Sequence, residues 1–429
     1  MNLARESFYT LIFQISGLAC ATVAGIITAR ALGPENKGIL TMAMLCPYFF
    51  FVVFNPTIEV AIIHHMGRKN YQAETFAGSA LILAFIFSLI ALILFFATSG
   101  IFGNFLYKGI GQKYLMLTVS SVPFYFMLYY FSSILRGSMN VKGYNISNQL
   151  MHFSNVTFIL MFLIWKLNVL EAIIAGISGI VLGGLYASIE VLRATRGVSF
   201  VKKLTATLLK DGCKLYVGSV ATFISFQVNF FILNYYADPS EIGFYSVAYM
   251  IANILLFFGI SLEIGLYPKI AHATIDEAIE LTEVSSRQML LITGVAALAM
   301  ALCSKYIVLA YGGRLFLPSV KPLLLLLPGM VIAVVPKVLG ALWLRKGWFF
   351  QLTLIAVSAS VMSLILNFML IPKFGSNGAA VATSLTYGFI FLIEIVLYAK
   401  YVKKDLFRLF VPARADMEIY RNIIGIFRR

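Results

Sequence analysis

The chain has 429 residues, of which 60% are hydrophobic and only 12% are charged, and its mean hydropathy is +0.90. A soluble domain is about half apolar and about one quarter charged, so this composition excludes an ordinary soluble protein and indicates a polytopic membrane protein. The net charge of +15 does not indicate nucleic-acid binding, because basic DNA-binding chains are not built from stacked apolar runs of about 20 residues.

Twelve apolar segments, separated by polar or Gly/Pro-rich breaks, are each long enough to span a membrane. The second and the tenth contain internal prolines, which predict bends in these helices. The segments cover residues 7–30, 38–63, 75–98, 114–135, 145–165, 170–192, 212–236, 242–267, 288–310, 320–344, 348–371 and 378–400. We therefore predict an all-α protein with 12 transmembrane helices, the first of which is not a cleaved signal peptide.

Basic residues indicate the orientation of these helices. If the N-terminus is cytoplasmic, most of the 33 lysines and arginines lie on the cytoplasmic side, so the positive-inside rule places both termini there. The basic linker at about 193–211 is open to two interpretations, a solvated loop or a helix on the membrane surface, since Val201, Leu204 and Leu208 share one helical face. The basic tail at about 403–429 is similarly amphipathic and is predicted to contact anionic lipids.

An internal repeat is visible at an offset of about 205 residues. It aligns Gly38 with Gly243 and Glu59 with Glu263. The chain is thus predicted to form two six-helix bundles, residues 1–205 and 206–429, that enter the membrane from the same side. Such a parallel repeat has a pseudo-two-fold axis along the membrane normal, with a central cavity between two halves that rock against each other.

Three stretches carry a resemblance to a known family. They are "ARALGPENKGILTMA" (29–43), "YYADPSEIGFYSVAYMIANILLFFGISLEIGLYPKIA" (235–271) and "FGSNGAAVATSL" (374–385). They resemble the motifs of Wzx-like flippases, which belong to the polysaccharide transporter family of the multidrug/oligosaccharidyl-lipid/polysaccharide superfamily. The resemblance spans the chain but does not indicate one substrate.

This resemblance implies a protein of the bacterial cytoplasmic (inner) membrane. Its substrate would be an undecaprenyl-pyrophosphate-linked oligosaccharide repeat unit, flipped by alternating access for the assembly of O-antigen, capsule or exopolysaccharide. Basic cavity residues would meet the anionic substrate, and a polysaccharide polymerase and chain-length proteins would be partners. Many relatives carry a charge in the seventh helix, where this chain has Gln227 and Asn229, so the coupling to H+ or Na+ is left open.

Acidic residues inside predicted membrane helices are candidates for ion coupling, because such groups are rare there and usually face the bundle interior or a water-filled cavity. Glu59 and Glu263 hold equivalent positions of the repeat, and Asn55 lies one turn before Glu59. The two glutamates either exchange ions in the cavity, brace two bent helices by hydrogen bonds, or extend to the cytoplasmic interface, which is the nearer end. Glu394 is a third candidate and a possible partner of Lys337.

The candidates for substrate binding are basic and amide side chains. Arg30 and Lys37 are predicted on the outer side, where they would either attract the departing pyrophosphate or cap a helix and bind headgroups. Amides suit sugar hydroxyls, although hydrogen bonds between helices explain them equally well. The full predicted set is Arg30, Lys37, Asn55, Gln227, Asn229, Asn234 and Lys337.

Two other functions make different predictions for this sequence. A multidrug/cation antiporter of the same superfamily predicts an acidic cavity lining. A membrane glycan polymerase or ligase needs a sizeable outer loop with acid/base residues, which the short outer loops do not provide. No Cys, His, Asp or Glu spacing predicts a metal site, and no cofactor is expected. A peptidoglycan-precursor flippase usually has two further helices, which are not found here.

Overall fold

The computed structural model describes residues 3–68, 71–106, 108–195, 197–402 and 406–410, and the regular structure in these ranges is entirely helical. The first half of the chain contains α1 (Leu3–Phe54), α2 (Ile58–Gly67), α3 (Ala73–Leu106), α4 (Gln112–Val119), α5 (Val122–Gly137), α6 (Val141–Leu163) and α7 (Val169–Thr195). The second half contains α8 (Lys202–Tyr236), α9 (Pro239–His272), α10 (Ile275–Leu302), α11 (Ser304–Gly312), η1 (Arg314–Ser319), α12 (Val320–Ile332), α13 (Val334–Arg345), α14 (Phe349–Val402) and η2 (Leu406–Leu409).

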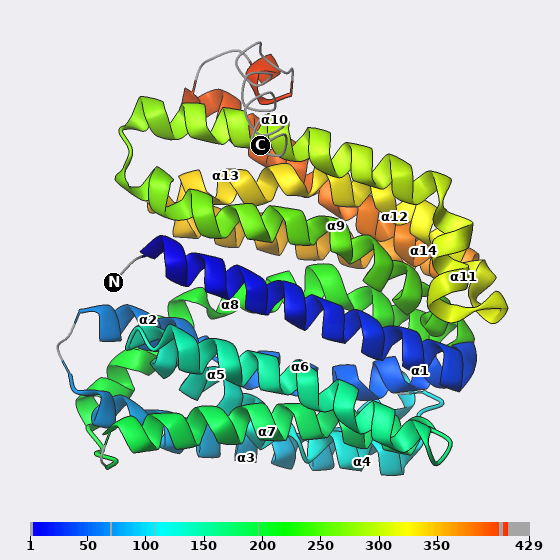
Figure 1. The fold of residues 1–429 in the computed structure, drawn as a ribbon, viewed down its shortest axis with the longest axis horizontal. Coiled ribbons are helices and arrows are strands. Elements are labelled where there is room, and N and C mark those ends of the chain that lie inside the picture. The colour runs from blue at the N-terminus through cyan, green and yellow to red at the C-terminus, as the bar shows by residue number, and fades with distance from the viewer. Residues whose placement is uncertain (1–2, 69–70, 107, 196, 403–405, 411–429) are drawn as a thin grey trace, which may run out of the picture.

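The helices run roughly along one common axis (Figure 1). Helices α3 to α7 form one side of the molecule and α9 to α14 form the other, with α1 lying between them. The chain begins at the end of the bundle that holds α2, called the N-terminal end below. The opposite end holds α4, α11 and the bend of α1.

Two of the long helices each contain two predicted spans, joined at a glycine. Gly33 in α1 has φ 73° and ψ 176°, and Gly375 in α14 has φ 54° and ψ −130°. Residues with a β-carbon rarely adopt such angles, so glycine lets the chain turn with little interruption of the helix. The bends divide α1 and α14 close to the predicted boundaries of the spans.

Nine helical segments of the described chain are long and apolar enough to cross a membrane, and some of them contain two predicted spans. Helix α6, which covers most of the predicted span 145–165, is not among them. Its face toward α1 is polar, as described below, so its mean hydropathy is low for its length. Polar side chains of a membrane helix usually face neighbouring helices or a cavity rather than lipid.

At the end opposite the N-terminal end, the two halves meet through a reciprocal contact that we call the glycine crossing. A β-carbon on Gly38 would overlap the carbonyl oxygen of Pro239, and one on Gly243 would overlap the carbonyl oxygen of Pro34. Each Pro-x-x-x-Gly segment therefore lies directly on the backbone of the other. Only glycine permits this approach, so the crossing holds the two halves together at this end.

At the N-terminal end, α2 contacts α8 through polar side chains. Thr57 Oγ1 donates to the Gly212 carbonyl at 2.6 Å, and His65 Nε2 lies 2.8 Å from Asp211 Oδ2. Asp211 Oδ1 also lies 2.6 Å from Lys214 Nζ. The halves are thus joined at both ends, by backbone packing at one and by side chains at the other.

The linker between the halves is neither a solvated loop nor a surface helix beyond Lys202, because it continues as the first turns of α8. Leu204 and Leu208 are fully buried, and Thr205 Oγ1 donates to Ser79 Oγ of α3 at 2.9 Å. The predicted division at residues 205 and 206 therefore falls within a continuous helix that packs on the first half. The predicted amphipathic face of the tail lies outside the described residues.

Candidate functional site

The polar face of α6 carries four side chains at helical spacing. Asn145, Asn148, Gln149 and His152 follow an i, i+3, i+4, i+7 pattern and therefore share one face. The helix is capped by Asn140, which precedes its first residue and whose Oδ1 accepts a hydrogen bond from the Gly143 amide at 2.9 Å. This cap fixes where the helix begins and hence the direction in which the stripe points.

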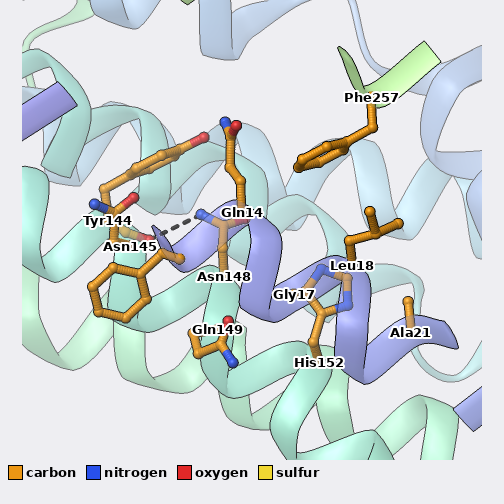
Figure 2. A pocket seen from close by; sticks show the side chains of 11 residues that line it. Gln14, Gly17, Leu18, Ala21, Tyr144, Asn145, Asn148, Gln149, His152 and Phe257 are labelled. Atoms are coloured by element: carbon orange, nitrogen blue, oxygen red, sulfur yellow. Dashed lines mark hydrogen bonds between the residues drawn. The ribbon is translucent and has the colours of Figure 1, made fainter. Parts of the chain in front are cut away.

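Helix α1 packs across this stripe and leaves a cavity of about 380 Å³, which we call the amide chamber. Gln149 Nε2 donates to Ser16 Oγ at 2.9 Å, and Asn145 Nδ2 donates to Thr10 Oγ1 at 3.1 Å. Figure 2 shows Gln14 of α1 extending between Tyr144 of α6 and Phe257 of α9. The lining consists of Phe13, Gln14, Gly17, Leu18, Ala21, Tyr144, Asn145, Asn148, Gln149, His152 and Phe257.

A second cavity of about 550 Å³, the mouth chamber, adjoins the first and shares Phe13 and Asn145 with it. It lies against the turn between α5 and α6, near the N-terminal end. The exposed Lys142 adds a cationic side chain to its wall. The lining consists of Tyr9, Phe13, Met139, Asn140, Val141, Lys142, Asn145 and Ile146.

The two chambers carry polar groups on largely apolar walls, and their lining is not acidic. Among the described residues that line them there is no aspartate or glutamate, and the basic groups are His152 and Lys142. Aromatic rings from Tyr9, Phe13 and Phe257 supply apolar faces. Amides beside aromatic rings are suited to a ligand that combines hydroxyl groups with apolar ring faces.

Asn55 and Glu59 lie elsewhere, at the break between α1 and α2. Asn55 Nδ2 donates to Glu59 Oε2 at 2.8 Å, while Asn55 Oδ1 accepts from the Tyr130 hydroxyl at 3.0 Å and from the Ile58 amide at 3.4 Å. Thr57, inside the break, has φ 49°. These contacts support the hypothesis that the pair braces a bend, whereas ion coupling by the half-buried Glu59 stays a prediction. The side chain of Glu263 in α9 lies outside the described residues.

Arg30 and Lys37 lie at the opposite end of the molecule from the mouth chamber. Arg30 Nη2 donates to the Ala310 carbonyl at 2.6 Å, near the C-terminal end of α11. Lys37 is buried, and its Nζ donates to Thr28 Oγ1 at 2.7 Å, across the bend of α1. The contact of Arg30 matches the predicted alternative of a helix cap. The two side chains are not brought together with the other predicted substrate residues.

The predicted residues of the second half are dispersed. Asn229 is buried, and its Nδ2 donates to the Tyr245 hydroxyl at 2.6 Å and to Thr383 Oγ1 at 3.1 Å, so its amide joins α8, α9 and α14. Buried Glu394 accepts from Trp343 Nε1 at 3.2 Å. The remaining three are Gln227, which is half-buried, Asn234, which is buried, and Lys337, whose Cδ lies near Gly259 of α9.

A family model described as "Polysaccharide biosynthesis protein" matches residues 3–274 of the chain. The chain belongs to this family. No curated protein matches it.

Solved structures share its fold. An inward closed conformation of the lipid II flippase MurJ has a TM-score of 0.75 at 15% identity, over 92% of this chain and 87% of that one. An inward-facing multidrug resistance MATE family transporter of the MOP superfamily has a TM-score of 0.73 at 12% identity, over 90% and 94% of the two chains. An outward-facing structure of such a transporter scores 0.66 at 13% identity, over 94% and 96%. The protein is thus a multi-pass membrane protein with the fold of MOP-superfamily transporters.

The sequence prediction missed most of this site. Neither Gln14 nor the α6 stripe belongs to the residue set predicted from the sequence. Its signal was nonetheless present, because "NISNQLMH" (145–152) places four polar groups on one face of a predicted membrane helix. These four side chains are uncharged amides and an imidazole, so a prediction based on charged residues does not include them.

Proposed function

We propose that the protein flips an undecaprenyl-pyrophosphate-linked oligosaccharide repeat unit across the bacterial cytoplasmic membrane for the assembly of a surface polysaccharide. The observation that carries this proposal is the pair of adjoining chambers, one lined by amides and the other bearing Lys142. Amides complement sugar hydroxyls, and a lysine complements a diphosphate. The polyprenyl tail would stay in the lipid, so only the head group needs a polar path.

We infer that the cycle is alternating access by 12 membrane crossings in two related halves, each of six. Two features support this inference. The glycine crossing joins equivalent Pro-x-x-x-Gly segments of the two halves, as expected for a pseudo-two-fold axis, and it holds them together at one end. The chambers lie near the other end, which the distribution of lysine and arginine assigns to the cytoplasm.

We also propose that transport is coupled to an ion. Glu59, Glu263 and Glu394 would take up and release H+ or Na+ as the halves move. Glu59 is half-buried and held by Asn55, so it stands beside a bend that would change shape when α2 moves on α8. A carboxylate at such a place can exchange a proton as its surroundings change.

The multidrug/cation antiporter is the rival function. It predicts carboxylates in the cavity, because a cationic drug needs a counter-charge away from water. The described residues that line the two chambers contain none. This lining favours a neutral or anionic head group over an organic cation.

Complementation tests the proposal directly. The gene is expressed in flippase-deficient strains that each make one defined lipid-linked repeat unit. We expect surface polysaccharide to return in at least one strain, with loss of the accumulated lipid-linked units. An efflux-deficient strain challenged with cationic drugs serves as the parallel assay for the rival. Accumulation of units on the inner face in every strain, despite normal expression, would contradict the proposal, and drug resistance would favour the rival.

A further inference from the structure

The hydrogen-bonding atoms of the amide chamber are unevenly used. Within the described part of the chain, Gln14 Oε1 and Gln149 Oε1 are buried and accept no hydrogen bond. Gln149 Nε2 donates a hydrogen bond to Ser16 Oγ, and Asn148 Nδ2 donates one to the Tyr144 carbonyl at 2.9 Å. Two buried acceptors, Gln14 Oε1 and Gln149 Oε1, are therefore left without partners. A buried acceptor without a partner is unfavourable, so these two positions favour a ligand that donates hydrogen bonds.

The chamber also contains no fixed positive charge. Its basic lining residue is His152, while Lys142 lies at the mouth chamber and is exposed. A carboxylate lies beside the mouth chamber, where Asn140 Nδ2 donates to Glu190 Oε1 at 3.3 Å. A carboxylate on a sugar would enter the amide chamber without a counter-charge and would face two carbonyl oxygens, which makes its burial unfavourable.

We propose that the amide chamber selects an uncharged sugar rich in hydroxyl or acetamido N–H donors and rejects acidic sugars such as uronic acids, while the mouth chamber receives the diphosphate. This proposal rests on the proposed function and adds to it the chemical class of the glycan. Each chamber would thus bind one part of the substrate's head group, the uncharged glycan in the amide chamber and the charged diphosphate in the mouth chamber. The donor-rich glycan lies between α1 and α6, and the anion lies beside Lys142, close to the membrane surface where its charge is hydrated.

Direct binding tests the selection. The full-length protein in lipid nanodiscs is titrated with two disaccharides of similar size, N,N′-diacetylchitobiose as the neutral probe and digalacturonic acid as the acidic probe. We expect the neutral probe to bind at least about tenfold more tightly, which corresponds to about 1.4 kcal/mol. Equal binding of the two probes overturns the proposal. The proposal is also overturned if the neutral probe shows no measurable binding at a 10-fold or greater molar excess over the protein.

Two substitutions separate recognition from structure. Gln14→Leu with Gln149→Leu removes both unpartnered acceptors, and we expect it to weaken the neutral probe at least about tenfold. Gln14→Lys supplies a cation, and we expect it to raise the affinity for the acidic probe by a similar factor. Gln351→Leu is the matched control, because Gln351 is an exposed glutamine of α14 away from both chambers. Wild-type binding by a folded double variant, checked by gel filtration and circular dichroism, contradicts the proposal.

Export assays keep this proposal distinct from the proposed function. Rescue of strains with neutral repeat units but not of strains with acidic ones supports both. Equal rescue by neutral and acidic units leaves the flippase function standing and refutes the selection. A neutral-sugar preference in nanodiscs without rescue in any strain refutes the flippase function and leaves the sugar site standing.

Discussion

Two helix pairs of the molecule, α1 with α6 and α8 with α14, occupy corresponding places in the predicted repeat but are built differently. The α1–α6 pair encloses the amide chamber, where Gln14 and Gln149 leave acceptors without partners. The α8–α14 pair is joined by direct hydrogen bonds, such as that from Ser363 Oγ to the Ser225 carbonyl at 3.0 Å, and by the amide of Asn229. Both pairs contain hydrogen bonds between helices, and α14 also holds unpartnered acceptors at Asn367 Oδ1 and Asn377 Oδ1. Among the described residues, the pairs differ in that the unpartnered glutamines of α1–α6 line a chamber, whereas α8 and α14 line neither of the two chambers.

This difference indicates a division of labour between the halves. A polar group in a membrane helix is stable when another group of the protein satisfies it, as at Asn229. A polar group that is left unsatisfied needs a ligand or water, as in the amide chamber. We therefore expect the first half to recognise the substrate and the second to act as the more rigid body.

The largest effect is expected from filling the chamber. Gly17 lines it, and an added β-carbon there would lie 3.0 Å from His152 Cδ2, so Gly17→Leu places a branched side chain in the cavity. We expect export to fall on the order of 100-fold, equivalent to about 2.7 kcal/mol, while the protein stays folded because His152 can move into the free space. Gly294→Leu in α10 is the control, since a β-carbon there meets nothing. Normal export by Gly17→Leu would show that the chamber is not on the substrate path.

The next largest effect is expected at the glycine crossing, where the two halves use equivalent Pro-x-x-x-Gly segments. Gly243→Ala puts a β-carbon onto the Pro34 carbonyl at the glycine crossing and should destabilise the close approach by about 1–3 kcal/mol. We expect a longer distance between spin labels on α1 and α9 at this end, and slower export. Gly388→Ala, where a β-carbon has open space, should change neither. An unchanged label distance in Gly243→Ala would argue against the crossing as the contact that joins the halves.

A smaller effect is expected on the free energy of unfolding, which should respond differently to substitutions in the two helix pairs. Asn229→Leu removes the amide that joins Tyr245 and Thr383 and should lower the free energy of unfolding by about 1–3 kcal/mol. Gln14→Leu removes a buried acceptor that has no partner, so it should cost little or even stabilise the protein. Thermal unfolding of the purified variants measures both. Equal destabilisation by the two substitutions would remove the contrast between the halves.

The smallest effect is expected at the glutamates. Glu59→Gln keeps an oxygen that can accept from Asn55 Nδ2 but cannot bind and release a proton, so the bend should persist. We expect Glu59→Gln with Glu263→Gln to reduce export a few-fold at normal protein level and to weaken its dependence on the pH of the medium. Export that is normal at every pH would show that Glu59 only braces α2.

Much of the fold could be predicted because the periods of apolar residues report directly on membrane helices. The breaks at Gly33 and Gly375 follow from glycine beside polar residues, although the continuity of α1 and α14 through them does not. The spacing of Leu204 and Leu208 predicts that they share one apolar face of a helix. Whether lipid or α3 covers that face depends on contacts with residues distant in sequence.

The site was less predictable because an asparagine or glutamine in a membrane helix can either join helices or line a cavity. Nothing in the local sequence distinguishes Asn229, which is satisfied by Tyr245 and Thr383, from Asn148, which lines a cavity. The cap that Arg30 forms on α11 likewise joins residues far apart in the chain. The α6 stripe was accessible from spacing alone, and its polarity is what keeps α6 from being apolar enough to be counted as a span.

The first turns of α8 make the two halves mechanically interdependent. Leu204 and Leu208 are fully buried, and Thr205 between them contacts α3 of the first half, yet they belong to a helix of 35 residues that also packs on α14 of the second. A chain divided before Lys202 and expressed as two fragments would leave this part of α3 on one fragment and the turns of α8 that contact it on the other. Because α8 is continuous, we expect a tilt of its later turns to move the turns that contact α3 as well.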